Sequence, residues 1–348
     1  MRHSLKITIA VLAFFIFIPL SKTNAQLQVD VGGYGQTWVI FHDYSETGKD
    51  VSGYRLRRGR LFARSRVNET FSATAWFDFA GPDRNLIDFH LDAHIYPWLN
   101  IRVGQFIMAG QTFDTGRLVS SRLIFHERPM FTTQLASTMG YDAFRDIGVM
   151  FYGNYGPLWY GVHAGNGTGR FTQAGTHITS RGFGEGLYGA RVDVELIEGL
   201  TIGGHASINS QNDAEIRGAA PVDIKRRSWS ARLMTYGLGI ERVFTEFEYA
   251  AGDRKDDQNF TFNGFYAQAG FKVTSDWHLL ARYDQFNRNR KGLPEESFDN
   301  ITLGSLYYFR TGNREIARFG LNYRIGKDNP GSIDNYIVLA WLQVRFIP

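Results

Sequence analysis

The sequence predicts an all-β protein, a 16-stranded antiparallel transmembrane β-barrel with a long third outer loop folded into the lumen. Segments of roughly ten residues with alternating apolar and polar side chains recur from near residue 31 to the C-terminus, as in tilted membrane strands. The connections between them are short and long in turn. Because backbone polar groups in lipid must be satisfied internally, such strands are expected to close into a barrel.

The first 25 residues are expected to be a secretory signal peptide. Arg2 and Lys6 precede a strongly apolar run, and small residues then lead to a cleavage site after Ala25. The run of roughly 14 apolar residues is shorter than the about 20 that a membrane-spanning helix needs. An uncleaved anchor is the alternative. We therefore expect a signal peptide at 1–25 and a barrel domain at 26–348.

Charge and cysteine content limit the possible functions. The 38 basic residues are 30 Arg and 8 Lys, and the loss of three of them with the signal peptide leaves 35 basic against 34 acidic residues. Arginine presents a rigid planar fork suited to carboxylate or phosphate oxygens. The absence of cysteine excludes a disulfide framework and thiol chemistry. Nucleic acid is not an expected partner, because the most basic stretch interleaves its arginines with apolar residues.

The strand assignment follows the two-residue period. In 87–96, residues such as Phe89 and Leu91 lie on one face, and residues such as Asp88 and His90 lie on the other. A helix would mix the two sets. The sixteen segments expected from this pattern are 31–42, 54–67, 70–80, 87–96, 100–108, 146–153, 158–165, 186–196, 200–209, 227–236, 240–251, 261–273, 277–286, 299–309, 315–325 and 336–346.

The longest connection is predicted to be functional. With both chain ends on the periplasmic side, residues 109–145 form the third outer loop. Long loops within compact folds are usually functional. We expect this loop to enter the barrel as a constriction, with an external lid as the alternative.

The polar strand faces are expected to line the interior, because the apolar faces meet lipid. The stretch "YRLRRGRLFARSRV" places four arginines on one face of the second strand, whereas Arg55 and Arg57 leave that register and are expected at the extracellular rim. Over all strands, thirteen basic and eight acidic residues are expected to face inward, Arg242 among the basic ones. Such a bias favours anions. A non-selective pore with structurally paired charges is the alternative.

No catalytic or metal site is expected. Asp88, His90, Asp92 and His94 stand about 6.5–7 Å apart from one to the next on one strand face, too far for all four to bind one ion unaided. Pairing of these groups with arginine is the favoured interpretation. We therefore expect no enzyme activity and no cofactor. An outer-membrane hydrolase that uses Asp88 and His90 is one alternative, and an adhesion or phage-receptor barrel with a plugged pore is another.

An ordered series of segments resembles the phosphate-selective porin O and P family over most of the mature chain. It includes "YRLRRGRLFARSRV", "PWLNIRVGQFIM", "FRDIGVMFYG" and "LAWLQVRF". The resemblance implies a homotrimeric channel in the outer membrane of a Gram-negative bacterium, which passes small anions and is narrowed by its third loop. The C-terminus departs from the usual porin pattern, since Ile347 and Pro348 follow Phe346.

The strand pattern and the resemblance together give a set of candidate arginines. The expected pore-lining, anion-binding residues are Arg58, Arg60, Arg64, Arg66, Arg102, Arg191, Arg318 and Arg324. The residues expected at the constriction are Arg117, Arg122 and Arg128. The expected partners are small anionic solutes, the lipid and lipopolysaccharide of the outer membrane, and two further copies of the chain.

Overall fold

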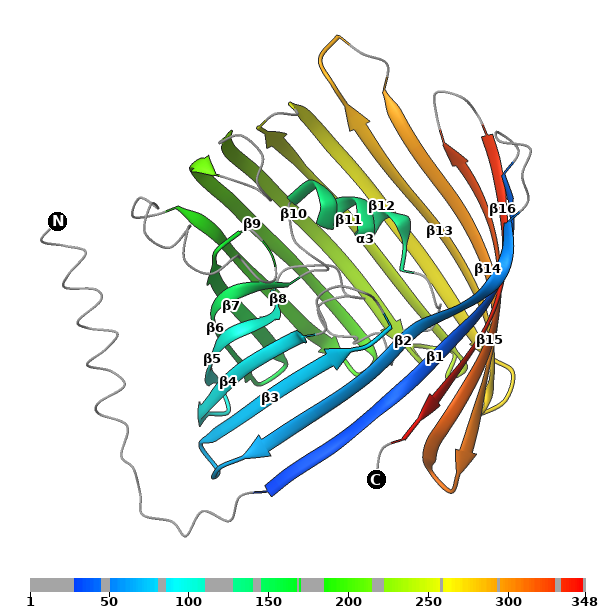
Figure 1. Cartoon of the computed structure of the whole chain (residues 1–348), viewed down its shortest axis with the longest axis horizontal. Helices are drawn as coiled ribbons and strands as arrows, with labels where there is room; N and C mark the ends of the chain where they lie inside the picture. The colour runs from blue at the N-terminus through cyan, green and yellow to red at the C-terminus, as the bar shows by residue number, and fades with distance from the viewer. Residues whose placement is uncertain are drawn as a thin grey trace, which may run out of the picture.

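The chain forms a closed antiparallel β-barrel in the computed structural model (Figure 1). The structure describes residues 28–44, 51–80, 86–109, 128–139, 145–167, 169, 185–214, 222–256, 259–292, 295–328 and 333–346. Each strand pairs with its sequence neighbours, and β1 also pairs with β16. The sheet therefore has no free edge.

The barrel has sixteen strands within the described residues, together with one helix. The strands are β1 (Gln28–Tyr44), β2 (Val51–Arg66), β3 (Phe71–Asp78), β4 (Leu86–Tyr96), β5 (Leu99–Ile107), β6 (Arg145–Tyr155), β7 (Leu158–Gly165), β8 (Gly186–Ile197), β9 (Leu200–Ala214), β10 (Val222–Tyr236), β11 (Val243–Lys255), β12 (Phe260–Lys272), β13 (Trp277–Asn289), β14 (Glu296–Thr311), β15 (Arg314–Asp328) and β16 (Ile333–Arg345). Helix α3 (Met130–Met139) lies between β5 and β6. That helix is too short and too polar to cross a membrane.

All sixteen expected strands are present, and the differences are at their ends. One of them concerns the β10–β11 turn, where Gly237 and Gly239 adopt positive φ angles of 73° and 71°. The turn extends to Val243, whose carbonyl accepts a bond from Gly237 N at 3.0 Å. Arg242 therefore lies exposed in this turn, and its expected place on the inner wall is wrong.

The connections differ between the two ends of the barrel. At the end that holds the start of β1 and the end of β16, consecutive strands are joined by tight turns such as Tyr155–Leu158 and Thr311–Arg314 (Figure 1). The long connections lie at the other end. The expected signal peptide, residues 1–25, lies outside the described residues.

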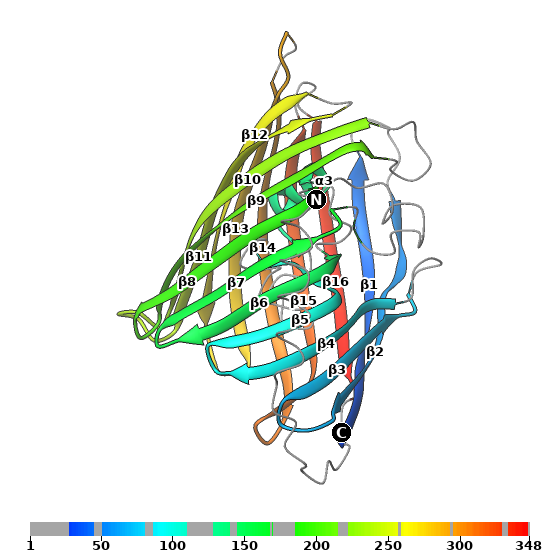
Figure 2. The same ribbon diagram turned by 90° about the vertical axis from the view of Figure 1, so that its left-hand side faces the viewer.

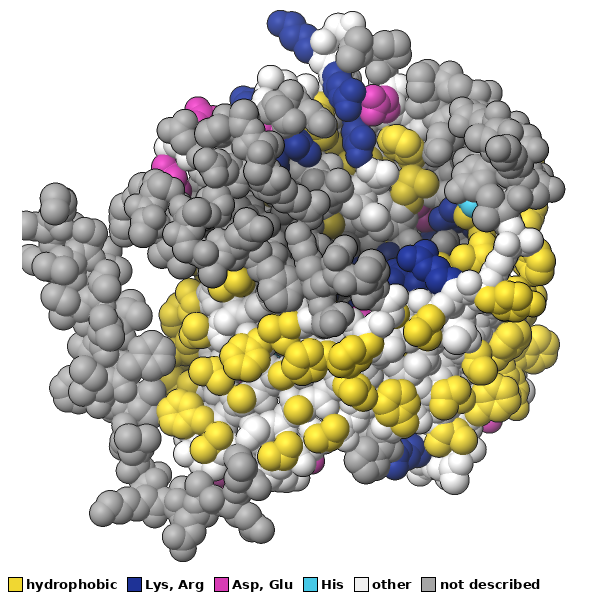
Figure 3. Space-filling view, in the orientation of Figure 1, with side chains coloured by type: hydrophobic (Ala, Val, Ile, Leu, Met, Phe, Trp, Pro, Cys, Tyr) yellow, Lys and Arg dark blue, Asp and Glu magenta, His cyan; other side chains and the backbone are white. Residues whose placement is uncertain are grey.

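The two faces of each strand differ as the alternation predicts. In β13, Leu279, Ala281 and Tyr283 are exposed, whereas Arg282 and Asp284 between them are buried in the barrel. The exposed apolar side chains form a broad band around the outside, seen on one side of the molecule in Figure 3. An apolar band on the outer surface of a closed barrel is the surface expected to face lipid.

The height of the wall is uneven. Strands β3 and β7 have 8 residues each, whereas β1 has 17 and β2 and β14 have 16 each. The short strands are neighbours around β3–β7 and form a low side of the barrel (Figure 2).

Leu91→Arg tests the assignment of the outer face. Leu91 is 55% exposed on the outside of β4, between Ala73 and Val103 of the adjoining strands. We expect the free energy of unfolding to fall by about 2–4 kcal/mol, because the new charge faces hydrocarbon. Urea titration in lipid vesicles, followed by tryptophan fluorescence, measures the loss. Tyr155→Arg, near the periplasmic turn, should cost at most about 1 kcal/mol, and equal losses would contradict the assignment.

Candidate pore-lining site

A β-bulge turns all six arginines of β2 toward the lumen. Gln36 of β1 pairs with Arg58, but its neighbour Thr37 pairs with Leu56, so Arg57 is an extra residue. The shift returns Arg55 to the inner face, directly opposite the inward-facing Trp38. Arg55 and Arg57 thus break the register near the extracellular end of β2, as expected, but the bulge keeps both on the lumen side, against Trp38. A bulge inserts one residue and reverses the alternation beyond it.

Aromatic rings lie against these arginines. The guanidinium carbons of Arg55 and Arg57 are 5.9 and 5.1 Å from the Trp38 ring centroid. The guanidinium carbon of Arg60 lies 5.9 Å from the Tyr34 ring. Cation–π contacts at these distances are attractive and hold a planar guanidinium in place.

The centre of the row is rich in positive charge. Arg58 Nη1 and Arg60 Nε bind the same Asp78 oxygen at 3.3 and 2.9 Å. The arginines Arg57, Arg60 and Arg128 lie near enough to repel the Arg58 guanidinium, and Asp78 attracts it. Guanidinium groups this close together repel one another, and a group of opposite charge lowers that repulsion.

The periplasmic half of the row is open to water. Arg64 and Arg66 are exposed, and neither makes an ion pair within the described part of the chain. Asp30 of β1 is the strand neighbour of Arg64, without an ion pair between them. The guanidinium carbon of Arg64 lies 5.1 Å from the Phe62 ring centroid. Its N–H groups are therefore directed by the ring and available to a solute.

The other predicted arginines also face the lumen, but several are held by carboxylates. Arg102 Nε binds Asp92 Oδ1 at 2.7 Å, and its guanidinium carbon lies 5.1 Å from the Tyr152 ring. Arg191 is fully buried and binds Asp193 Oδ2 at 2.8 Å. Some of the N–H groups of these arginines therefore already donate to carboxylates of the wall.

Two further predicted arginines lie on the inner face of β15. Arg318 is buried beside Glu315, with 3.8 Å between Nε and Oε1, and it donates to Gln343 at 3.1 Å. Arg324 is half-buried, and its strand neighbour on β14 is the buried Thr302. Arg345 Nη2 also binds Glu315, at 3.1 Å.

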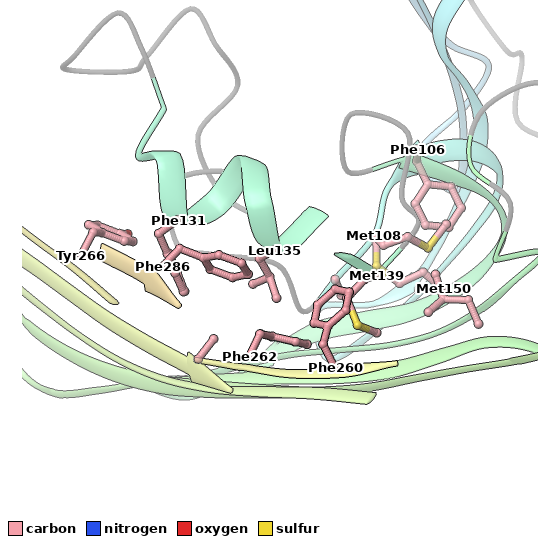
Figure 4. Close-up of a cluster of buried hydrophobic side chains, with 13 residues drawn as sticks. Phe106, Met108, Phe131, Leu135, Met139, Met150, Phe260, Phe262, Tyr266 and Phe286 are labelled. Carbon is pink, nitrogen blue, oxygen red and sulfur yellow. The ribbon is translucent and has the colours of Figure 1, made fainter. Parts of the chain in front are cut away.

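Helix α3 packs on the inner wall opposite the arginine row. It contacts β10, β12 and β13, which lie eight, six and five strands from β2 around the sixteen-strand ring (Figure 1). Phe131 and Leu135 point toward the inward-facing Phe262 and Phe286 (Figure 4). Gly264 provides the space, since a side chain there would come within 2.8 Å of the Phe131 ring.

Polar contacts attach both ends of α3 to the wall. The Met130 amide donates to Asp284 Oδ2 of β13 at 2.9 Å. The Met139 carbonyl accepts from Asn209 Nδ2 of β9 at 3.4 Å. Arg128, two residues before the helix, lies close enough to repel the guanidinium of Arg58 on β2. This end of the loop therefore extends from the β13 wall toward the arginine row.

Arg117 and Arg122 lie outside the described residues, and so does most of the loop. Their expected role at the constriction stays a prediction.

Several lumen arginines were missed by the sequence pattern. Arg145 binds Asp88 at 2.7 Å, and Arg226 binds Asp256 at 2.5 Å. Both belong to strands that begin earlier than expected, so they fell in predicted loops. Arg145 directly precedes the alternating residues of β6, which is the signal that could have included it.

The row on β4 is part of an ion-pair network. Asp88 binds Arg145, and Asp92 binds Arg102, as the arginine-pairing interpretation predicted. His90 Nδ1 lies 2.8 Å from Asp92 Oδ2. No three His, Asp or Glu side chains converge on a metal-sized site anywhere in the described ranges.

The profile of a family described as "Phosphate-selective porin O and P" matches residues 22–332. No curated protein sequence matches the chain significantly.

Solved structures share the fold at low sequence identity. An anion-selective porin from Comamonas acidovorans superposes with a TM-score of 0.69 at 14% identity, over 92% of this chain and 100% of that chain. The outer-membrane channel DcaP of Acinetobacter baumannii gives a TM-score of 0.62 at 12% identity, over 94% and 99%. The trimer form of OmpT from Vibrio cholerae gives 0.62 at 14% identity, over 92% and 99%.

Asp193→Asn tests the role of the buried charge pairs. Asp193 binds both Arg191 and Arg232, at 2.8 and 3.2 Å, and all three side chains are buried. Its neutralisation leaves two buried guanidiniums short of a carboxylate, so the free energy of unfolding should fall by about 3 kcal/mol. Urea titration in vesicles measures this loss.

The matched control is Asp253→Asn. Asp253 binds Arg227, whose side chain is 61% exposed on the outside of the barrel. An exposed pair contributes at most about 1 kcal/mol. Equal losses in the two variants would show that burial does not decide the contribution.

Asp284→Asn tests the attachment of α3. Loss of the charged acceptor of the Met130 amide should weaken docking by about 1–3 kcal/mol, so we expect more noise in the open-channel current of planar bilayers. Asp299→Asn is the control, since Asp299 lies on the outer face and accepts from Tyr283 at 2.9 Å. Open-channel noise that is unchanged by Asp284→Asn would contradict this role.

Proposed function

The chain belongs to the phosphate-selective porin O and P family, and from this premise we propose that it is an outer-membrane channel through which small anions diffuse passively. A porin of this family resides in the outer membrane of a Gram-negative bacterium. The proposal concerns what the channel prefers and which residues produce the preference.

The observation that carries the anion preference is the charge around Arg58. Three arginines repel its guanidinium while Asp78 binds it, and one of those arginines, Arg128, comes from the third loop. Wall and loop thus both supply positive charge at this point of the lumen. A permeating anion lowers the mutual repulsion of these groups, whereas a cation raises it.

The arginine row offers several weak sites in sequence. Arg58 and Arg60 share Asp78, so each gives only part of its donor capacity to a solute. Arg64 and Arg66, nearer the periplasm, are exposed. Conduction needs sites that attract an ion and still release it. Arginines that already bind a carboxylate or water hold an anion weakly enough for this.

Elsewhere in the lumen, most of the arginines that share a carboxylate are buried in the wall. Asp193, Asp256 and Glu315 each bind two arginines of the wall. Buried charges need such partners whatever the channel conducts. The preference is therefore assigned to the β2 row, with Arg102, Arg191, Arg318 and Arg324 in supporting positions and with Arg117, Arg122 and Arg128 at the constriction.

The family name and one solved neighbour support this class of solute. The neighbour from Comamonas acidovorans is described as an anion-selective porin. Phosphate is a candidate through the family name, since guanidinium forks match its oxygens.

The channel is further proposed to act as a homotrimer in lipid that contains lipopolysaccharide. An 8-residue strand tilted by about 40° rises only about 20 Å, less than the apolar band of about 25 Å. The low β3–β7 side would therefore leave lipid mismatched, and contact with another copy removes that cost. A trimer form is described for OmpT of Vibrio cholerae.

Reversal potentials in planar bilayers test the anion preference. In a KCl gradient the wild-type channel should favour chloride. The double variant Arg57→Gln, Arg58→Gln should lower the chloride-to-potassium permeability ratio by at least about threefold, because two lumen charges are lost while Arg60 still neutralises Asp78.

The control is Arg227→Gln, which removes one charge from the outer face of β10. We expect its permeability ratio to equal that of the wild type. Potassium preference in the wild type would refute the proposal, and a ratio near one would favour the general, non-selective porin.

A further inference from the structure

One aromatic side chain interrupts the arginine row. Phe62 faces the lumen between Arg60 and Arg64, and it is half-exposed. Its ring stacks on Trp76 of β3, with 4.9 Å between the ring centroids and 24° between the ring planes. A path for hydrated inorganic anions alone gains nothing from an apolar ring in the middle of its charged row.

The rings belong to a small apolar cluster of the inner wall. Tyr34, Trp76 and Ile87 are buried, and Phe62 packs against them at the surface. The cluster therefore anchors Phe62 from behind. A ring that is held rigidly and partly exposed can bind another planar group at little cost in conformational entropy.

A cation lies against the same two rings. The guanidinium carbon of Arg64 is 5.1 Å from the Phe62 centroid and 6.0 Å from the Trp76 centroid. Arg64 is exposed and makes no ion pair within the ranges that the structure describes. One point of the lumen wall thus combines free N–H donors with an apolar ring.

We propose that Phe62, stacked on Trp76, makes the arginine row selective for anions that carry a planar apolar group, such as aryl carboxylates. The proposal rests on the proposed anion-channel function. The solute ring packs on Phe62 while its carboxylate accepts from Arg64. Arg60, four residues from Arg64 and about 13 Å away along the strand, is buried against Asp78, so Arg64 is the donor at this point.

The probes are benzoate and gluconate, two monovalent carboxylates that differ in their body. Gluconate has a hydroxylated chain, whereas benzoate has a flat apolar ring. Bi-ionic reversal potentials against chloride give the permeability of each. We expect benzoate to be more permeant than gluconate in the wild type, and Phe62→Ser to lower the benzoate-to-gluconate ratio by roughly threefold, as for the loss of one aromatic contact.

Two variants separate recognition from structural support. Phe62→Leu keeps an apolar side chain without a ring and should lower the ratio to an intermediate value. Phe298→Ser removes another inner-wall aromatic that contacts an arginine, Arg288 at 5.6 Å, and should leave the ratio unchanged.

The outcomes that overturn the inference differ from those that overturn the channel function. An unchanged benzoate-to-gluconate ratio in Phe62→Ser overturns the inference, as does an equal fall in Phe298→Ser. A wild-type channel that prefers potassium in KCl alone removes the anion-channel premise itself. If Phe62→Ser lowers the chloride preference together with the benzoate permeability, Phe62 only positions Arg64. This outcome also overturns the inference.

Discussion

Closure of the sheet is the constraint on which the rest of the structure depends. β1 pairs with both β2 and β16, so each strand has bonded neighbours on both sides. A membrane barrel must close in this way because lipid offers no hydrogen bonds to a free edge. Every strand then has one lipid face and one lumen face, and all charges at membrane depth must turn inward. The concentration of arginine inside the barrel is a direct consequence.

Inward charges serve two purposes, and their partners distinguish them. Where a carboxylate lies between two arginines, as Asp193 does between Arg191 and Arg232, the group is buried and part of the wall. Along β2, Arg58 and Arg60 share Asp78 in the same way, whereas Arg64 and Arg66 are exposed and make no ion pair within the described residues. The Phe62 ring holds the Arg64 guanidinium in place without neutralising it. Positive charge therefore remains available to a solute at this side of the lumen.

The third loop places its helix on the opposite wall. Apolar contacts of Phe131 and Leu135 with β12 and β13, and a bond from the Met130 amide to Asp284, hold α3 there. The barrel interior thus has an apolar, helix-covered side and an arginine-lined side. Arg128 adds positive charge from the loop to the arginine-lined side. The asymmetry gives a permeating anion one preferred wall.

The sequence by itself determined the strand number, the two faces and the arginine row, because a period of two residues is a local property of a strand. It identified Arg58, Arg60, Arg64 and Arg66 correctly as neighbours on one face. Only the tertiary structure decided the position of Arg55 and Arg57, since the bulge beside Gln36 depends on pairing with β1. It also decided which arginines are neutralised by a carboxylate. Arg145 and Asp88, for example, form an ion pair although they are far apart in the chain. Alternation specifies the face of a side chain, whereas its partner across the barrel depends on register and closure.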